Sequence, residues 1–224
     1  MKIEKTVKVK NRKDQSWKAF QAKSIHGIEN IYYNVRQIAY LKNQDQENDI
    51  DYIEELEQVI AADLEELASE IFEASLDQSM TCYLIWSRIQ ERDNLYEHVF
   101  RVSLLVAIMA AQENYQEKEI KNAIMGTLTH EFGQVILKPR LNLDYWVDYK
   151  VAKNGLNHYR LGFEYLQKNP HIYPEVKCVM ANQCPYLKQK IRQDRVCSSY
   201  EGCRLGQILW ACDDLDHYFI ELKA

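Results

Sequence analysis

The sequence contains few of the residues that interrupt helices. Only 7 Gly and 4 Pro occur in 224 residues, which is low for a globular chain. Because Gly and Pro mark turns and end helices, their scarcity disfavours folds built from many short strands joined by tight turns. Apolar residues make up 46% of the chain, so a large core can form. We therefore expect an all-α protein with roughly eight to ten helices.

The sequence also lacks an uninterrupted apolar run long enough to cross a bilayer. Its first residues, MKIEKTVKVKNRKDQ, are charged and include no apolar stretch of the kind found at the centre of a signal peptide. We expect a cytoplasmic protein without membrane contact. In that compartment its six Cys are expected to be reduced.

Basic residues are absent from one long stretch of the chain. Thirteen Asp or Glu and no Lys or Arg lie between Asn43 and Ser87, whereas residues 1–23 hold eight Lys or Arg and two acids. With an overall charge of -5, the acidic body disfavours general nucleic-acid binding, which depends on attraction to phosphates. We read the acidic helix 51–76 either as a face for a basic protein partner or a second copy of the chain, or as a solvated surface without a partner.

Two regions are expected from the composition: a basic arm with an N-terminal helix over residues 1–50, and a helical domain over residues 51–224. Residues 1–15 show no helical period, so we predict a short strand or a disordered arm there. Apolar residues at spacings of three and four predict helices in the rest of the chain. The predicted helices cover residues 16–41, 51–76, 79–90, 95–112, 118–134, 173–183 and 203–222, with one or two more between 144 and 166 and an irregular loop over 185–202.

Several His residues lie on or beside apolar helical segments. His98 is in a helix that is apolar on most sides, His130 precedes Glu131, and Asp213 is in the mostly apolar segment LWACDDLDHYF. Buried carboxylates are costly unless they are paired or bind a metal. Imidazole nitrogens and carboxylate oxygens from several helices are the ligands that a hydrolytic divalent metal uses. Spacing alone favours hydrogen-bonded core His and a solvated Asp-rich helix face over a metal site.

Four segments in order resemble the HD superfamily of metal-dependent phosphohydrolases, and most closely its HD-GYP branch. These segments are RIQERDNLYEHVFRVSLL, MGTLTHEFGQVILKP, LNHYRLGFEYL and ILWACDDLD, which together span about two-thirds of the chain. The resemblance implies a multi-helix HD-domain-like bundle with an N-terminal helical extension. It also implies that His98, His130, His158 and Asp213 match metal-binding positions of the family, with Glu131 at the position of the family's Asp.

The sequence departs from the family pattern at important positions. Glu131 is one methylene longer than the Asp it replaces. The extra methylene moves the carboxylate outward by more than ~1 Å, which exceeds the tolerance of a tight metal site. Gln134 stands where the family has a Lys thought to contact substrate phosphate, and a neutral amide does not replace that charge. The segment MANQC, residues 180–184, stands where the family has a His-His-Glu run, and the GYP loop is missing.

The resemblance and its departures leave two functional hypotheses. The first is a catalytically degenerate HD-GYP-like domain that acts in signalling by binding a protein partner or a nucleotide. The second is a surviving phosphohydrolase that uses a single divalent Fe, Mn or Zn ion and cleaves cyclic di-GMP or another nucleotide. The degenerate domain binds either one ion or none.

Four Cys lie close together near the C-terminus. Cys178, Cys184, Cys197 and Cys203 are separated by 5, 12 and 5 residues, a spacing unlike that of zinc knuckles. We expect free, partly buried thiols at these positions. The alternatives are a structural zinc, an iron–sulfur cluster, or a redox role for a thiolate near Lys188, Lys190, Arg192 and Arg195.

Overall fold

The computed structural model describes residues 2–43, 49–77, 94–141, 158–183 and 200–221. Across these ranges it contains eight helices and no strand, which confirms the predicted all-α class. In chain order the helices are α1 (Lys2–Asn43), α2 (Ile50–Ser75), α4 (Leu95–Gln112), α5 (Glu117–Thr129), α6 (Phe132–Leu141), α7 (His158–Lys168), α8 (Pro174–Gln183) and α10 (Tyr200–Glu221).

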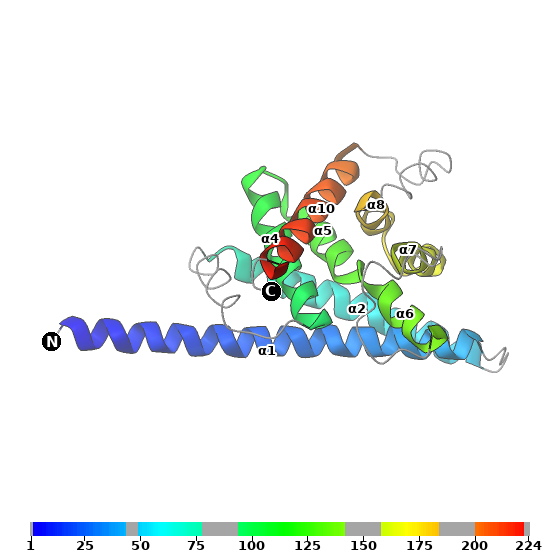
Figure 1. The fold of residues 1–224 in the computed structure, drawn as a ribbon, viewed down its shortest axis with the longest axis horizontal. Helices are drawn as coiled ribbons and strands as arrows, with labels where there is room; N and C mark the ends of the chain where they lie inside the picture. Colours follow the sequence, from blue (N-terminus) through cyan, green and yellow to red (C-terminus); the bar gives the residue numbers. More distant parts are fainter. Residues whose placement is uncertain (1, 44–48, 78–93, 142–157, 184–199, 222–224) are drawn as a thin grey trace.

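Helix α1 is the longest element, and its N-terminal part extends beyond the rest of the molecule (Figure 1). Our prediction of a strand or a disordered arm over residues 1–15 is wrong, because the helix already begins at Lys2. Residues 2–15 carry no apolar repeat from which a helix could be predicted. Farther along, Ile28, Tyr32 and Val35 are fully buried at spacings of three and four and join α1 to the bundle.

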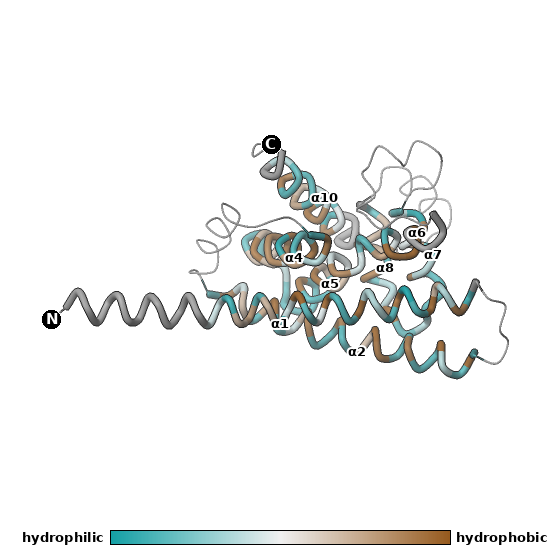
Figure 2. The backbone as a smooth tube through the Cα atoms, turned by 60° about the horizontal axis from the view of Figure 1, so that its bottom comes forward, coloured by the Kyte–Doolittle hydropathy of each residue, from teal (hydrophilic) through white to brown (hydrophobic). Residues whose placement is uncertain are grey.

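Helices α1 and α2 run antiparallel and pack against each other (Figure 2), and one face of α2 is buried. Ile60, Leu64 and Ile71 are fully buried on this face, as the sequence periodicity predicts. Tyr32 of α1 donates a hydrogen bond of 3.1 Å to the carbonyl oxygen of Leu128, and it packs edge-on against Phe132. This buried tyrosine connects the N-terminal helix to the segment that joins α5 and α6.

Helix α4 begins and ends where the sequence predicts, at Leu95 and Gln112. It is long and apolar enough to span a membrane by length and composition, so our expectation of no such segment does not hold on those criteria. However, 61% of this helix is buried inside the bundle, and that packing accounts for its apolar character. The location in the cytoplasm remains a prediction.

The segment THEFGQ does not lie in one continuous helix, contrary to our prediction of a helix over 118–134. Helix α5 ends at Thr129, His130 is its C-cap, and α6 begins at Phe132. Gly133 is therefore in the first turn of α6 rather than near the end of a helix. A Cβ atom on Gly133 would lie 1.7 Å from the carbonyl oxygen of His158, so α6 and α7 approach each other through backbone atoms.

The remaining helices close the bundle around α5. Helix α10 packs against both α8 and α4, and α5 contacts α2, α4 and α8 (Figure 1). The start of α4, the end of α5 and the middle of α10 therefore meet at one place in the interior. Three other predicted features, the helix 79–90, the helical part of 144–157 and most of the loop 185–202, lie outside the described residues.

Candidate metal centre

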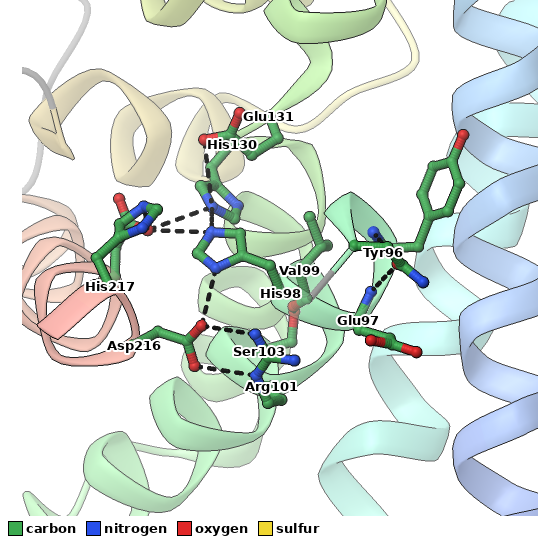
Figure 3. Close-up of polar contacts among 12 residues, drawn as sticks. Tyr96, Glu97, His98, Val99, Arg101, Ser103, His130, Glu131, Asp216 and His217 are labelled. Atoms are coloured by element: carbon green, nitrogen blue, oxygen red, sulfur yellow. Dashed lines mark hydrogen bonds and ion pairs between the residues drawn. The ribbon is translucent and has the colours of Figure 1, made fainter. Parts of the chain in front are cut away.

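The start of α4 is fixed by a capping residue. The side chain of Asn94 accepts hydrogen bonds from the backbone N–H groups of Tyr96 and Glu97, at 3.0 and 2.9 Å. An N-cap of this kind defines the first helical turn. It places His98 four residues after the cap, with its side chain pointing into the bundle (Figure 3). Asn94 therefore has a capping role.

Three of the predicted ligands converge on one point. His98, His130 and Asp213 are all buried, and one ligand atom from each lies within 4.8 Å of the others. The Nε2 atoms of the two imidazoles are 3.2 Å apart, and Asp213 Oδ1 is 3.1 Å from His98 Nε2. Asp213 Oδ1 is also 3.8 Å from His130 Nε2. This buried cluster can hold a metal ion, and we call it the His98–His130–Asp213 centre.

The hydrogen bonds on the far side of each ring set the protonation of the two imidazoles. His98 Nδ1 is 3.0 Å from Asp216 Oδ2, and His130 Nδ1 contacts the carbonyl oxygen of Thr127. A carboxylate and a carbonyl can only accept, so both Nδ1 atoms must carry the hydrogen. In the neutral rings the two Nε2 atoms then present lone pairs to each other and to the Asp213 carboxylate. Such a point suits a cation, which is either a proton that one Nε2 atom then donates to the Asp213 carboxylate or a metal ion.

The spacing of these atoms fits ligands that share one ion. Zinc lies about 2.0–2.1 Å from imidazole nitrogens, so two tetrahedral ligand atoms are about 3.3 Å apart. Two of the three separations, 3.2 and 3.1 Å, agree with this value, whereas the third, 3.8 Å between His130 Nε2 and Asp213 Oδ1, is longer. Two imidazoles and one carboxylate also suit iron or manganese. The donor set therefore matches a divalent transition metal such as zinc, iron or manganese.

Burial and neighbouring charges shift the pKa values at this centre. Burial lowers the pKa of His130 below its usual value, although Glu131 and Asp213 oppose this shift. Burial would raise the pKa of Asp213, but its hydrogen bond to His98 and the nearby His130 and His217 hold it well below the usual range. A neutral imidazole and an ionised carboxylate are the forms that bind metals.

Two other predicted ligands lie beside the centre rather than in it. Glu131 Oε1 is 3.5 Å from His158 Nε2 and 3.7 Å from His130 Nε2, and neither Glu131 nor His158 belongs to the converging group. Burial would raise the pKa of Glu131, but His158, His130 and His98 together lower it. Glu131 is thus an ionised carboxylate that faces His158. Its Oε2 atom has no hydrogen-bond partner among the described residues.

Gln134 is in the first turns of α6, and its side chain is buried. Its backbone N–H donates a bond of 2.9 Å to the carbonyl oxygen of Glu131. The structure therefore places the amide that we predicted to contact substrate inside the protein. A phosphate group could not reach it without a rearrangement of α6.

Three residues near the centre were not among the predicted site residues. Asp216 contacts His98, and Arg101 binds both carboxylate oxygens of Asp216, at 3.2 and 2.9 Å (Figure 3). His217 Nε2 is 3.5 Å from Asp213 Oδ1, and its ring lies 4.9 Å from that of His98. The i, i+3 spacing of His98 with Arg101, and of Asp213 with Asp216, is a sequence signal that could have indicated the contacts between α4 and α10.

The comparisons with known proteins add no relative. A scan against protein-family models, a search of curated proteins and a search of solved structures each found no match. Membership of the HD superfamily therefore remains a prediction from the sequence resemblance.

The cysteines are only partly described. Cys178 is disulfide-bonded, so our prediction of a reduced thiol is wrong at this position. That prediction used the usual redox state of a compartment, which does not take account of which cysteines the fold brings together. Cys212 is free and buried, and burial raises its pKa to about 12. The side chains of Cys184, Cys197 and Cys203 lie outside the described residues.

The lowered pKa values predict how the metal-free protein responds to acid. The folded-state pKa of His130 is below 6.5 and that of Glu131 is below 4.5, so the unfolded chain binds these protons first as the pH falls. Stability from both groups is therefore complete above the unfolded pKa values and is lost toward lower pH. We expect the free energy of unfolding, measured in urea with a chelator present, to start to fall below about pH 6.5.

A matched variant checks that expectation. His130→Gln removes the titrating ring, so the loss of stability should begin only in the carboxylate range, near about pH 4.5. Replacement of the exposed His26 by Gln should leave the profile unchanged. If the wild type and His130→Gln lose stability in parallel over the whole range, the assignment of this titration to His130 is wrong.

Proposed function

We propose that this protein is a catalytically degenerate HD-like domain that binds one divalent metal ion and acts in signalling through a protein partner. The ion would be iron, manganese or zinc, held by His98, His130 and Asp213. The convergence of these three side chains in a buried position carries the proposal. The order of the motifs in the sequence supports an HD-like scaffold independently of the geometry.

The enclosure of the centre favours binding over turnover. His98 and His130 are fully buried, and Asp213 is 3% exposed. A hydrolytic metal needs an open position where water and substrate can meet. A buried centre without access for a substrate is instead typical of structural metal sites, where binding of the ion contributes directly to folding. In this role the ion would stabilise the contacts between α4, α5 and α10.

The residues next to the centre also support a domain without turnover. Glu131, at the position of the family's second ligand, faces His158 and is not in the converging group. Gln134 is buried and has no charge with which to bind a phosphate. The two substitutions therefore remove both a ligand for a second ion and the cation that would hold the substrate.

A surviving single-metal phosphohydrolase is the second candidate. Three protein ligands leave further coordination positions for water. Glu131 lies beside His130, with Oε1 at 3.7 Å from His130 Nε2, and its Oε2 has no hydrogen-bond partner among the described residues. A carboxylate in that position could accept a proton from a metal-bound water. Its substrate would be a phosphodiester, with cyclic di-GMP or another cyclic nucleotide as the candidate ligand.

Turnover and metal content together separate the two candidates. The purified protein is stripped with a chelator, loaded in turn with zinc, manganese or iron, and assayed with bis(p-nitrophenyl) phosphate and cyclic di-GMP. A degenerate domain is expected to retain one ion per chain and to show no hydrolysis above the His130→Ala variant. Metal-dependent hydrolysis that is lost in His130→Ala would replace this proposal by the second candidate.

The acidic face of α2 is the surface that we propose for the partner. Five acidic residues of this helix are exposed and form no ion pair among the described residues. They are Asp51, Glu54, Glu55, Glu66 and Glu73. By contrast, Glu70 pairs with Lys23, and Glu57 pairs with Lys42. Charged faces of this kind steer association with a partner of opposite sign. The basic N-terminal segment of a second copy is one such partner, since residues 1–23 carry eight Lys or Arg.

Self-association through this face can be measured directly. We expect the sedimentation coefficient to decrease with rising salt, because surface charges are screened. Glu54→Lys combined with Glu55→Lys should weaken the association by about tenfold or more through charge repulsion. Glu113→Lys, which changes an exposed acid on α4's C-cap, is the control. A wild type that is monomeric at low salt would show that a second copy is not the partner.

A further inference from the structure

Asp216 contacts the centre without belonging to it. Its side chain is fully buried on α10, and its Oδ2 atom accepts from His98 Nδ1 at 3.0 Å and from Arg101 Nη2 at 2.9 Å. Arg101 Nε also donates to Oδ1 at 3.2 Å. Every carboxylate oxygen of Asp216 is therefore bound, and Figure 3 shows the carboxylate between the His98 ring and the Arg101 guanidinium.

The two helices carry matched pairs of side chains. His98 and Arg101 are three residues apart on α4, and Asp213 and Asp216 are three residues apart on α10. Residues at this spacing lie on the same side of a helix. As a result, the two carboxylates of α10 contact the two nitrogens of the His98 ring: Asp213 lies near Nε2 and Asp216 near Nδ1.

We propose that Asp216, itself held by Arg101, is a positioning residue that fixes His98 in the tautomer and orientation needed for Nε2 to bind the metal. The inference deepens the proposed function and depends on it only for the identity of the ligand. A histidine ligand commonly donates its second ring N–H to a carboxylate, which makes the ring more basic and restricts its rotation. The bidentate guanidinium restricts the carboxylate in turn.

A simpler explanation is that Asp216 serves only to join α10 to α4 through its ion pair with Arg101. A buried ion pair would be expected to affect folding when one partner is removed. It would not set the position of the proton on His98. The tautomer of His98 therefore distinguishes a positioning role from a purely structural one, and it can be read in the absence of any metal.

The first experiment uses long-range nitrogen–proton NMR correlations of the imidazole rings in the full-length, metal-free protein at neutral pH. The wild type is expected to show a proton on His98 Nδ1, whether or not Nε2 is also protonated. Asp216→Asn should give a mixture of tautomers or the Nε2–H form, while Asp214→Asn, an exposed neighbour on the same helix, should match the wild type. A wild-type His98 in the Nε2–H form, or an unchanged tautomer in Asp216→Asn, would overturn the proposal.

Metal binding provides the second readout. Asp216→Asn is expected to lower zinc affinity, measured by competition with a chromophoric chelator, by about 10- to 100-fold. It should also change the visible absorption spectrum of the cobalt-loaded protein. Arg101→Lys keeps the charge but loses the bidentate geometry, so we expect a smaller loss of affinity; it also serves as the test variant if Asp216→Asn does not fold. Affinities and spectra equal to those of Asp214→Asn would contradict a positioning role.

The metal centre and the positioning role of Asp216 are tested by different measurements, so one can fail without the other. A wild type that binds no zinc, manganese or iron would refute the proposed metal centre. The tautomer of His98 would still decide whether Asp216 positions the ring. A wild type that binds metal with the same affinity as Asp216→Asn would leave the proposed function in place and refute the positioning role.

Discussion

Zinc affinity is expected to fall by more than about a hundredfold when His130 is replaced by Ala. Substitution of residues that only support a ligand already costs 10- to 100-fold, and His130 is proposed as a ligand itself. The substitution would leave His98 and Asp213 as the remaining members of the converging group. Two protein ligands are fewer than the three or four that zinc sites in proteins use. Chelator competition or isothermal titration calorimetry measures the change.

A histidine outside the centre provides the control for this prediction. His26 is exposed on α1, with a side-chain exposure of 73%, and His26→Ala should bind zinc as the wild type does. Thermal unfolding with and without zinc adds a second comparison, because a ligand that binds only the folded state raises its stability. Zinc should stabilise the wild type and His26→Ala but not His130→Ala. Equal affinities in all three proteins would show that zinc binds elsewhere.

A Cβ atom at Gly133 is expected to cause the largest loss of stability among the single substitutions that we consider. It would lie 1.7 Å from the carbonyl oxygen and 2.4 Å from the carbonyl carbon of His158. These are backbone atoms, so the contact cannot be relieved by rotation of a side chain. Helices α6 and α7 would have to separate, which we expect to cost about 3 kcal/mol or more. For a chain of this size the melting temperature should fall by about 6–12 °C.

Gly27 on α1 provides a matched glycine for comparison. A Cβ atom there would be 3.7 Å from Leu67 Cδ2, which is an ordinary contact. Gly27→Ala should therefore be neutral or stabilise the protein by about 0.5–1 kcal/mol, as expected for Ala in a helix interior. Differential scanning calorimetry of both variants gives the comparison. If Gly133→Ala were as stable as Gly27→Ala, the close approach of α6 and α7 would be wrong.

Apolar periodicity predicted the helices whose faces are buried. Leu64 and Ile71 on α2 repeat at helical spacing because that face packs against α5. The same reasoning failed for residues 2–15, where α1 continues without an apolar repeat. It also missed the break at His130, since the segment remains buried on both sides of the junction. Local periodicity reports burial of a face, whereas a change in direction between two buried helices depends on tertiary packing.

The ligands of the candidate centre were predicted from the order of motifs, and three of them converge. The residues that support these ligands were not predicted from the sequence, because Arg101 and Asp216 each resemble an ordinary charged residue on a helix. Their role depends on the alignment of α4 with α10, which brings together residues 115 positions apart. Glu131 shows the converse: its position beside His130 was correctly identified, but its carboxylate faces His158.

Anomalous X-ray diffraction from crystals of the zinc-loaded protein locates the ion directly. We expect one anomalous peak per chain, about 2.0–2.2 Å from His98 Nε2, His130 Nε2 and an oxygen of Asp213. The peak should be absent from crystals of His130→Ala. No peak at this position, with His98 and His130 still hydrogen-bonded to each other, would contradict the metal centre and leave a buried polar network in its place.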